Sequence, residues 1–237
     1  NNKDKTIILL HGLRSNKSDK YYIELIKEFY ELNYSIFIFD FRNHGTSEQG
    51  KFTFGDDEVD DLESALKYLN GNKKINNFAI WGFSYGATTA SIFNLSNINL
   101  NKDIKIFGVI ADTPYYDPLE VLTDEVSKRT PLNSFLSGLL EPGIIFSSQI
   151  LYCLDLKNIK KIFDSKSSAI SPTLVFGCDN DTTVPKTHPV RVHERLGYLS
   201  NYLEFENCLN HGDAFIYNKE KYMSEIDNFL KKQFKYE

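Results

Sequence analysis

The stretch GFSYG at residues 82–86 places a serine between two glycines. The apolar run 77–81 before it is typical of a buried strand, and the small residues after it favour a helix. A sharp strand-to-helix turn crowds the backbone, and the two glycines leave room there. Ser84 would then stand at a helix N-terminus, where free N–H groups stabilise negative charge. That position suits a nucleophile, but a serine N-cap after a glycine turn has the same pattern, so the motif needs partners.

Five histidines are candidates for the base, because a serine hydroxyl attacks well only beside a base that a third group orients. His211 lies between the last expected strand and the last expected helix, in LNHGDAF, and is the preferred base. His188 and His193 fall in or beside a predicted surface helix and are expected to be solvated. His11 and His44 are expected to shape their own loops.

Three aspartates at strand ends are candidates for the group that orients the base. Asp179 and Asp181 both lie in FGCDNDTTVP at residues 176–185, and Asp112 ends another expected strand. Aspartate is also a common turn residue, so each of the three has loop shaping as an alternative role.

Two backbone N–H donors are needed to bind the oxyanion that forms during acyl transfer. Tyr85 directly follows the serine and offers one donor. Leu13 follows His11-Gly12 at the end of the first expected strand, so its amide is the expected second donor.

Strand-like and helical patterns alternate along the chain, which predicts a parallel sheet. The pattern indicates one α/β domain over residues 1–237, with a doubly wound, mostly parallel sheet and a helical cap insertion at about 112–171. Ligands of such sheets bind at the carboxyl ends of the strands. The expected strands are 6–10, 35–40, 76–81, 104–111, 172–177 and 202–206, and the expected helices are 18–32, 56–70, 84–95, 186–197 and 219–234.

Composition limits the classes of function. The net charge of -5 at pH 7, without a long basic run, argues against nucleic-acid binding. Cys153, Cys178 and Cys208 are scattered without metal-ligand spacing, which predicts reduced core thiols and a cytoplasmic location. We expect no metal and no cofactor.

The apolar run 135–154 carries Glu141 as its single charge. Pro142-Gly143 in its middle favours two short buried segments over a membrane span. The run either lines an acyl pocket or packs on the core. Tyr115 and Tyr116, which follow the strand ending at 112, are expected either to wall the pocket entrance or to pack in the core.

Several segments in the correct order resemble the α/β-hydrolase superfamily from Ile7 to the final helix. They are LLHG (9–12), DFRNHGTSEQG (40–50), GFSYGA (82–87), DTTVP (181–185) and NHGD (210–213). The resemblance implies an α/β-hydrolase fold whose cap covers the serine. It also implies a catalytic triad in the chain order Ser84, Asp181, His211.

The same resemblance favours Asp181 over Asp179, because the family acid usually stands four residues before the proline of its VP pair, here Pro185. The gap from Gly177 is one residue longer than in the family, so Asp179 stays in reserve. Family members usually begin with a strand hairpin that this sequence lacks, which indicates a truncated chain or a shortened sheet.

Within the superfamily, the chain resembles the Bem46-like branch related to serine peptidases, whose members often carry an upstream membrane anchor. We therefore expect a serine hydrolase acting on a small-molecule ester or thioester with an apolar acyl chain, with membrane association through an upstream segment. The alternatives are a serine peptidase with the same triad and a non-catalytic binding relative.

Overall fold

The computed structural model of the chain describes residues 2–96, 100–129, 139–152, 154–165 and 168–234. Six strands form one sheet in the order β2-β1-β3-β4-β5-β6, and all five neighbouring pairs are parallel. Every one of these strands therefore ends at the same edge of the sheet, as expected. The strands are β1 (Asn2–Leu10), β2 (Tyr34–Ile38), β3 (Asn77–Phe83), β4 (Lys105–Asp112), β5 (Thr173–Cys178) and β6 (Ser200–Phe205).

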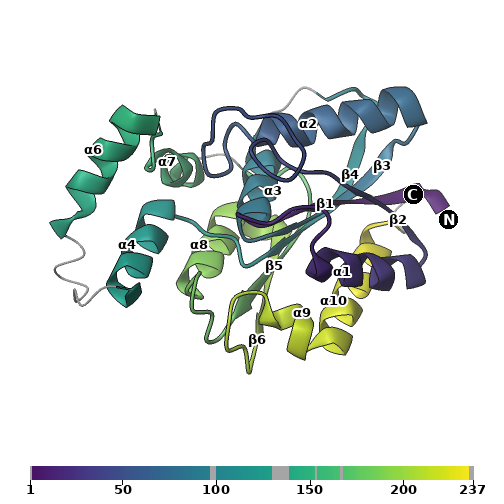
Figure 1. Cartoon of the computed structure of the whole chain (residues 1–237). Helices are drawn as coiled ribbons and strands as arrows, with labels where there is room; N and C mark the ends of the chain where they lie inside the picture. Colours follow the sequence, from purple (N-terminus) through teal and green to yellow (C-terminus); the bar gives the residue numbers. More distant parts are fainter. Residues whose placement is uncertain (1, 97–99, 130–138, 153, 166–167, 235–237) are drawn as a thin grey trace.

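Helices cover both faces of the sheet, which makes the fold doubly wound (Figure 1). Helices α1, α9 and α10 pack on one face, and α2, α3 and α8 pack on the other. The described helices are α1 (Lys20–Glu31), α2 (Val59–Tyr68), α3 (Tyr85–Leu95), α4 (Pro118–Arg129), α6 (Glu141–Tyr152), α7 (Asn158–Asp164), α8 (Thr187–Leu196), α9 (Asp213–Tyr217) and α10 (Lys219–Gln233).

Side chains of each central strand alternate between two hydrophobic cores. In β1, Ile7 and Leu9 join the core under α1 and α10, whereas Ile8 and Leu10 join the core under α2 and α3. All four are fully buried, and burying such a side chain stabilises the fold by about 1.5–3 kcal/mol. Strands buried on both faces read as continuous apolar runs, which is why they were recognisable in the sequence.

The cap leaves the sheet at the end of β4 and returns at β5. Its helices α4, α6 and α7 gather at one end of the sheet, beside α3 and α8 (Figure 1). Within it, Leu119, Leu154 and Leu156 form a small apolar cluster of their own.

The prediction of two short buried segments within 135–154 is wrong. Residues Glu141–Tyr152 form one helix, and residues 135–138 and 153 lie outside the described part. Pro142 is the second residue of this helix, where its missing N–H costs nothing. Leu139 and Phe146 are 63% and 65% exposed, so much of the apolar surface faces solvent.

The cysteines also differ from the expectation of reduced thiols. Cys178 and Cys208 form a disulfide, with their Cα atoms 5.7 Å apart. Cys178 ends β5 opposite Phe205 of β6, and Cys208 follows three residues later, so pairing of the strands brings the thiols together. A separation of 30 residues in sequence gives no sign of this contact. Cys153 lies outside the described residues.

Candidate active site

Ser84 occupies a tight turn between β3 and α3. Its backbone has a φ of 53° and a ψ of -112°, a conformation that L-residues rarely adopt and that costs roughly 1–3 kcal/mol. A Cβ at Gly82 would overlap the Gly86 carbonyl, and a Cβ at Gly86 would overlap the Leu10 carbonyl. The Ser84 N–H donates to the Asp112 carbonyl oxygen at 2.8 Å, which fixes the turn to β4.

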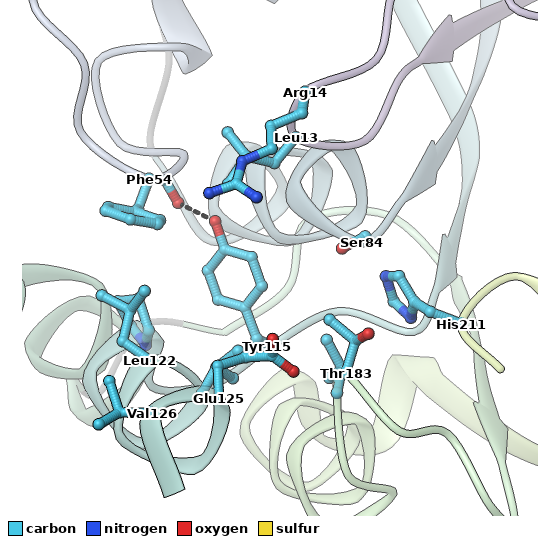
Figure 2. A pocket seen from close by; sticks show the side chains of 13 residues that line it. Leu13, Arg14, Phe54, Ser84, Tyr115, Leu122, Glu125, Val126, Thr183 and His211 are labelled. Atoms are coloured by element: carbon cyan, nitrogen blue, oxygen red, sulfur yellow. Dashed lines mark hydrogen bonds between the residues drawn. The ribbon is translucent and has the colours of Figure 1, made fainter. Parts of the chain in front are cut away.

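His211 stands on the loop between β6 and α9, beside Ser84. The Asp213 carboxylate accepts the N–H groups of Leu209 and Asn210 at 2.9 and 2.7 Å, so the loop before the histidine is held in shape. The His211 ring packs on Phe83 with 4.6 Å between ring centroids. Figure 2 shows a ring nitrogen of His211 facing Ser84.

Asp181 contacts the other side of the His211 ring. Its Oδ2 lies 2.6 Å from His211 Nδ1. Its Oδ1 accepts the N–H groups of Thr183 and Val184, each at 2.8 Å, and the side chain is fully buried. His211 Nε2 is buried and has no hydrogen-bond partner among the described residues, so it is the nitrogen available to a neighbouring hydroxyl.

The two other candidate acids contact different groups. The Asp179 carboxylate accepts the N–H groups of Asn207 and Cys208, both at 3.1 Å. Asp112 accepts the Tyr222 hydroxyl at 2.7 Å beneath the site. Complete burial raises the pKa of Asp112 to about 7, although the Tyr222 hydrogen bond opposes the shift.

The two expected oxyanion donors come from different elements, Tyr85 from α3 and Leu13 from the loop after β1. Tyr85 is the first residue of α3, and the first N–H groups of a helix have no acceptor within it. Leu13 lines the same cavity as Ser84. Its neighbours Gly12, Arg14 and Ser15 all donate their N–H groups to acceptors, whereas no acceptor in the described part of the chain contacts the Leu13 N–H.

Two of the other histidines shape loops, as predicted. His11 Nε2 accepts the Phe41 N–H at 3.0 Å, and His44 Nδ1 lies 2.9 Å from the Arg42 carbonyl oxygen. Burial lowers the pKa of His11 to about 4.

The prediction that His188 is solvated is wrong. It is 3% exposed, and its Nδ1 accepts the Tyr116 N–H at 3.3 Å. Burial lowers its pKa. His193 is half-buried and contacts the Ser200 hydroxyl at 2.8 Å. The α8 surface that seemed exposed in the sequence is covered by residues from the start of the cap, which no pattern within α8 reveals.

A cavity of about 420 Å³ opens at Ser84 and His211 (Figure 2). Most of its wall is apolar. Helix α4 supplies five of the lining residues and the loop before α2 supplies Phe54, which the sequence did not mark as part of a pocket. Tyr115 both lines the cavity and belongs to the buried core, and its hydroxyl donates to the Phe54 carbonyl oxygen at 2.6 Å. The lining residues are Leu13, Arg14, Phe54, Ser84, Tyr115, Pro118, Val121, Leu122, Glu125, Val126, Thr183, Val184 and His211.

Described residues of the run 135–154 line a different cavity. Ile144, Ser147, Ser148 and Leu154 face a space of about 470 Å³ that does not include Ser84. None of the described residues of this run lines the cavity at Ser84, and residues 135–138 and 153 lie outside the described part. In Figure 1, α6 stands far from the sheet, with α7 between it and α3. Tyr116 packs on Phe163 instead of lining the entrance.

Within the described residues, no group of three His, Cys, Asp or Glu side chains is arranged to hold a metal ion. Nor is any described helix both long enough and apolar enough to cross a bilayer.

Comparison with known proteins places the chain among the alpha/beta hydrolases. A family model described as alpha/beta hydrolase fold matches residues 5–127. The lysophosphatidylserine lipase ABHD12 of Danio rerio is 24% identical over 234 residues, which are 95% of this chain and 58% of that protein. The chain thus spans little more than half of this relative.

Solved structures also resemble the chain. The esterase Pf2001 of Pyrococcus furiosus superposes with a TM-score of 0.72 at 25% identity, over 97% of this chain and 83% of the esterase. A monoacylglycerol lipase of Paleococcus ferrophilus has the same fold, with a TM-score of 0.67 at 18% identity over 96% and 94% of the two chains. The fold expected from the sequence motifs is therefore confirmed.

Proposed function

Since this chain belongs to the alpha/beta hydrolase fold family, we propose that it is an esterase- or lipase-like hydrolase, which cleaves carboxylic esters or thioesters through an acyl-enzyme on Ser84. The observation that carries the proposal is the series of contacts between the side chains at the sheet edge. Asp181 holds His211 Nδ1 at 2.6 Å, which leaves Nε2 for the Ser84 hydroxyl.

In the first step, His211 Nε2 takes the Ser84 proton while the hydroxyl oxygen attacks the acyl carbonyl carbon. The Leu13 and Tyr85 amides bind the oxyanion. His211 then gives the proton to the leaving alcohol or thiol as the ester bond breaks. Water, deprotonated by the same nitrogen, attacks the acyl-enzyme and releases the acid with Ser84 restored.

The apolar cavity supports a medium or long acyl chain as the acid portion of the substrate. Leu122 and Val126 of α4 and Phe54 line it together with Ser84. A cavity of about 420 Å³ is within the usual size of small-molecule sites.

Arg14 favours an acidic group elsewhere on the substrate. Its guanidinium turns into the cavity near Phe54 and Tyr115 (Figure 2), and it is the one cation among the described lining residues. A guanidinium binds a phosphate or carboxylate with paired hydrogen bonds. The relative named a lysophosphatidylserine lipase supports testing acidic lysolipids beside neutral monoacylglycerols.

The test is hydrolysis of nitrophenyl esters from acetyl to palmitoyl, with acyl thioesters and an aminoacyl nitroanilide as further substrates. Ser84→Ala should lower kcat by about 10⁶-fold, as loss of an activated nucleophile does. Ser91→Ala is the matched control, because Ser91 lies in α3, the helix that follows Ser84, and its hydroxyl donates to the Ala87 carbonyl oxygen. Activity of the Ser84 variant within tenfold of the parent would contradict the proposal.

The other outcomes separate the alternatives. Cleavage of the nitroanilide without ester cleavage would indicate a serine peptidase using the same triad. Failure of a fluorophosphonate to label Ser84 in the folded parent would indicate a non-catalytic binding relative.

The expectation of a cytoplasmic location rested on reduced thiols, which the Cys178–Cys208 disulfide contradicts. The Cys178–Cys208 disulfide favours an oxidising compartment. Attachment to a membrane through a segment upstream of Asn1 remains part of the proposal, and flotation of the natural full-length protein with lipid vesicles tests it.

A further inference from the structure

Asp181 and His211 stand on loops that follow two neighbouring strands, β5 and β6. The disulfide joins these two loops. Asp181 comes three residues after Cys178, and His211 comes three residues after Cys208. The covalent bond therefore lies at the same distance along the chain from each of the two side chains that must meet.

A second connection runs beside the disulfide. The Asp179 carboxylate accepts the N–H groups of Asn207 and Cys208 on the opposite loop, both at 3.1 Å. The Asp179 N–H donates to the Phe205 carbonyl oxygen at 3.0 Å. These bonds continue the pairing of β5 with β6 beyond its last register pair, Cys178 with Phe205.

The other hydrogen bonds that hold Asp181 and the loop of His211 stay within each loop, and the His211 ring packs on Phe83 of β3. Asp181 Oδ1 is held by the Thr183 and Val184 amides, and the loop of His211 is held by the Asp213 carboxylate. Neither set of bonds determines how far apart the two loops stand. That spacing decides whether the 2.6 Å contact forms.

We propose that the Cys178–Cys208 disulfide and Asp179 together form a clamp that sets the Asp181–His211 distance. Asp179 is then a positioning residue for the proposed reaction. The inference rests on the proposed function for its catalytic consequence, and on the contacts of the two loops for its geometry.

The distance between Asp181 and His211 must be held within a narrow range. An N–H to carboxylate bond weakens steeply beyond about 3.2 Å, so a displacement of about 1 Å between the loops breaks the Asp181–His211 contact. A misplacement of this size costs about 10²-fold in rate. Both cysteines are fully buried, so the disulfide of the clamp is shielded from solvent while the protein is folded.

The test compares the parent with Asp179→Ala, Asp179→Asn and the double variant C178A/C208A. Asp179→Ala and the double variant should each lower kcat by about 10-fold or more, with KM within about twofold, because most of the cavity wall comes from other elements. The rate of fluorophosphonate labelling of Ser84 should fall by the same factor. Asp179→Asn keeps one acceptor oxygen and should recover part of the rate.

Asn94→Ala is the control for lost stability. The Asn94 amide donates to the Ser171 carbonyl and the Thr173 hydroxyl at the start of β5, at the opposite end of the sheet from the site. This variant should lower the Tm without lowering kcat at 25 °C. If the clamp variants lose no more kcat than Asn94→Ala at a similar loss of Tm, the clamp is overturned.

A readout without activity separates this inference from the proposed function. The ring N–H proton of His211 should give a far-downfield proton NMR signal in the parent while it bonds to Asp181, and the clamp variants should lose that signal. A parent with the signal but without hydrolysis would overturn the proposed function alone. A signal that persists in both Asp179→Ala and the double variant would overturn the clamp alone.

Discussion

The sheet edge that carries the triad candidates and the cap that covers it are built by different interactions. At the edge, Ser84 and Asp181 are held by backbone hydrogen bonds of 2.8 Å and by turns without space for a Cβ. In the cap, Leu119, Leu154 and Leu156 make a small apolar cluster, and Phe146 is exposed. Backbone bonds fix atoms to within fractions of an ångström, whereas side-chain packing fixes shape. Damage to the edge should therefore abolish the chemistry, and damage to the cap should change its substrate.

After loss of the nucleophile itself, the largest effect is expected at the edge, from Asp181→Asn. The amide preserves the shape of the side chain but no longer holds His211 in the tautomer with a free Nε2, so kcat should fall by about 10⁴-fold. Steady-state kinetics on a nitrophenyl ester measures the change. Asp179→Asn is the matched control and should lose far less. Equal losses in the two variants would remove the distinction between orienting acid and clamp.

The next largest effect is a pH-dependent loss of stability that arises from Asp112, which is buried under the same edge. Its pKa of about 7 in the folded protein lies above the 3.8 of an exposed aspartate, so the folded state binds its proton more tightly. Its contribution to the free energy of unfolding is therefore complete below pH 4 and is lost as the pH rises through 7. The loss is on the order of 4 kcal/mol.

Urea unfolding of the parent and of Asp112→Asn between pH 4 and pH 8 measures this contribution. The asparagine variant should gain stability relative to the parent as the pH rises. A constant difference between the two proteins across this range would show that Asp112 ionises normally.

Substitutions in the cap should change the selectivity for the acyl chain length of the substrate. Val126→Trp adds bulk to the wall of the cavity at Ser84, so kcat/KM for long acyl esters should fall by about 10 to 100-fold while acetyl ester hydrolysis is preserved. Ile144→Trp is the control, because Ile144 lines the separate cavity. This variant should not change the dependence of activity on acyl chain length. A uniform loss across all chain lengths would mean that the cap supports the chemistry itself.

The smallest effect is expected from Arg14→Gln. Loss of one charge-assisted hydrogen-bonding group should raise KM for an acidic lysolipid by about 10-fold and leave KM for a neutral monoacylglycerol unchanged. Arg14→Lys should recover part of the affinity. An equal change for both substrates would assign Arg14 to the shape of its loop.

The contrast between the sheet edge and the cap also explains which features could be predicted from the sequence. All six strands were found because each is a short apolar run bounded by turn residues. Ser84, Asp181 and His211 were found because each lies in a turn motif at a strand end, and parallel strands bring their carboxyl ends to one edge. The structure places these three side chains together.

The features that were missed depend on contacts between distant segments. The cavity wall formed by Val121, Leu122 and Val126 is an ordinary half-buried helix face until α4 is placed over the serine. The burial of His188 and the disulfide likewise arise from packing and strand pairing. None of these contacts leaves a local pattern of residue types.

The pairing of β4 with β5 has a consequence for how this protein can be altered. The cap departs after Asp112 and returns to a strand whose Phe176 is the register partner of Asp112, and the Thr113 N–H donates to Phe176 at 3.0 Å. The insertion itself re-enters the sheet at Thr173, the register partner of Val109, so both of its ends are anchored to neighbouring strands. Doubling the length of a flexible insertion between fixed ends costs only about 0.6 kcal/mol. We therefore expect the sheet to accept a cap of different length or sequence between β4 and β5 without a change in the turn at Ser84.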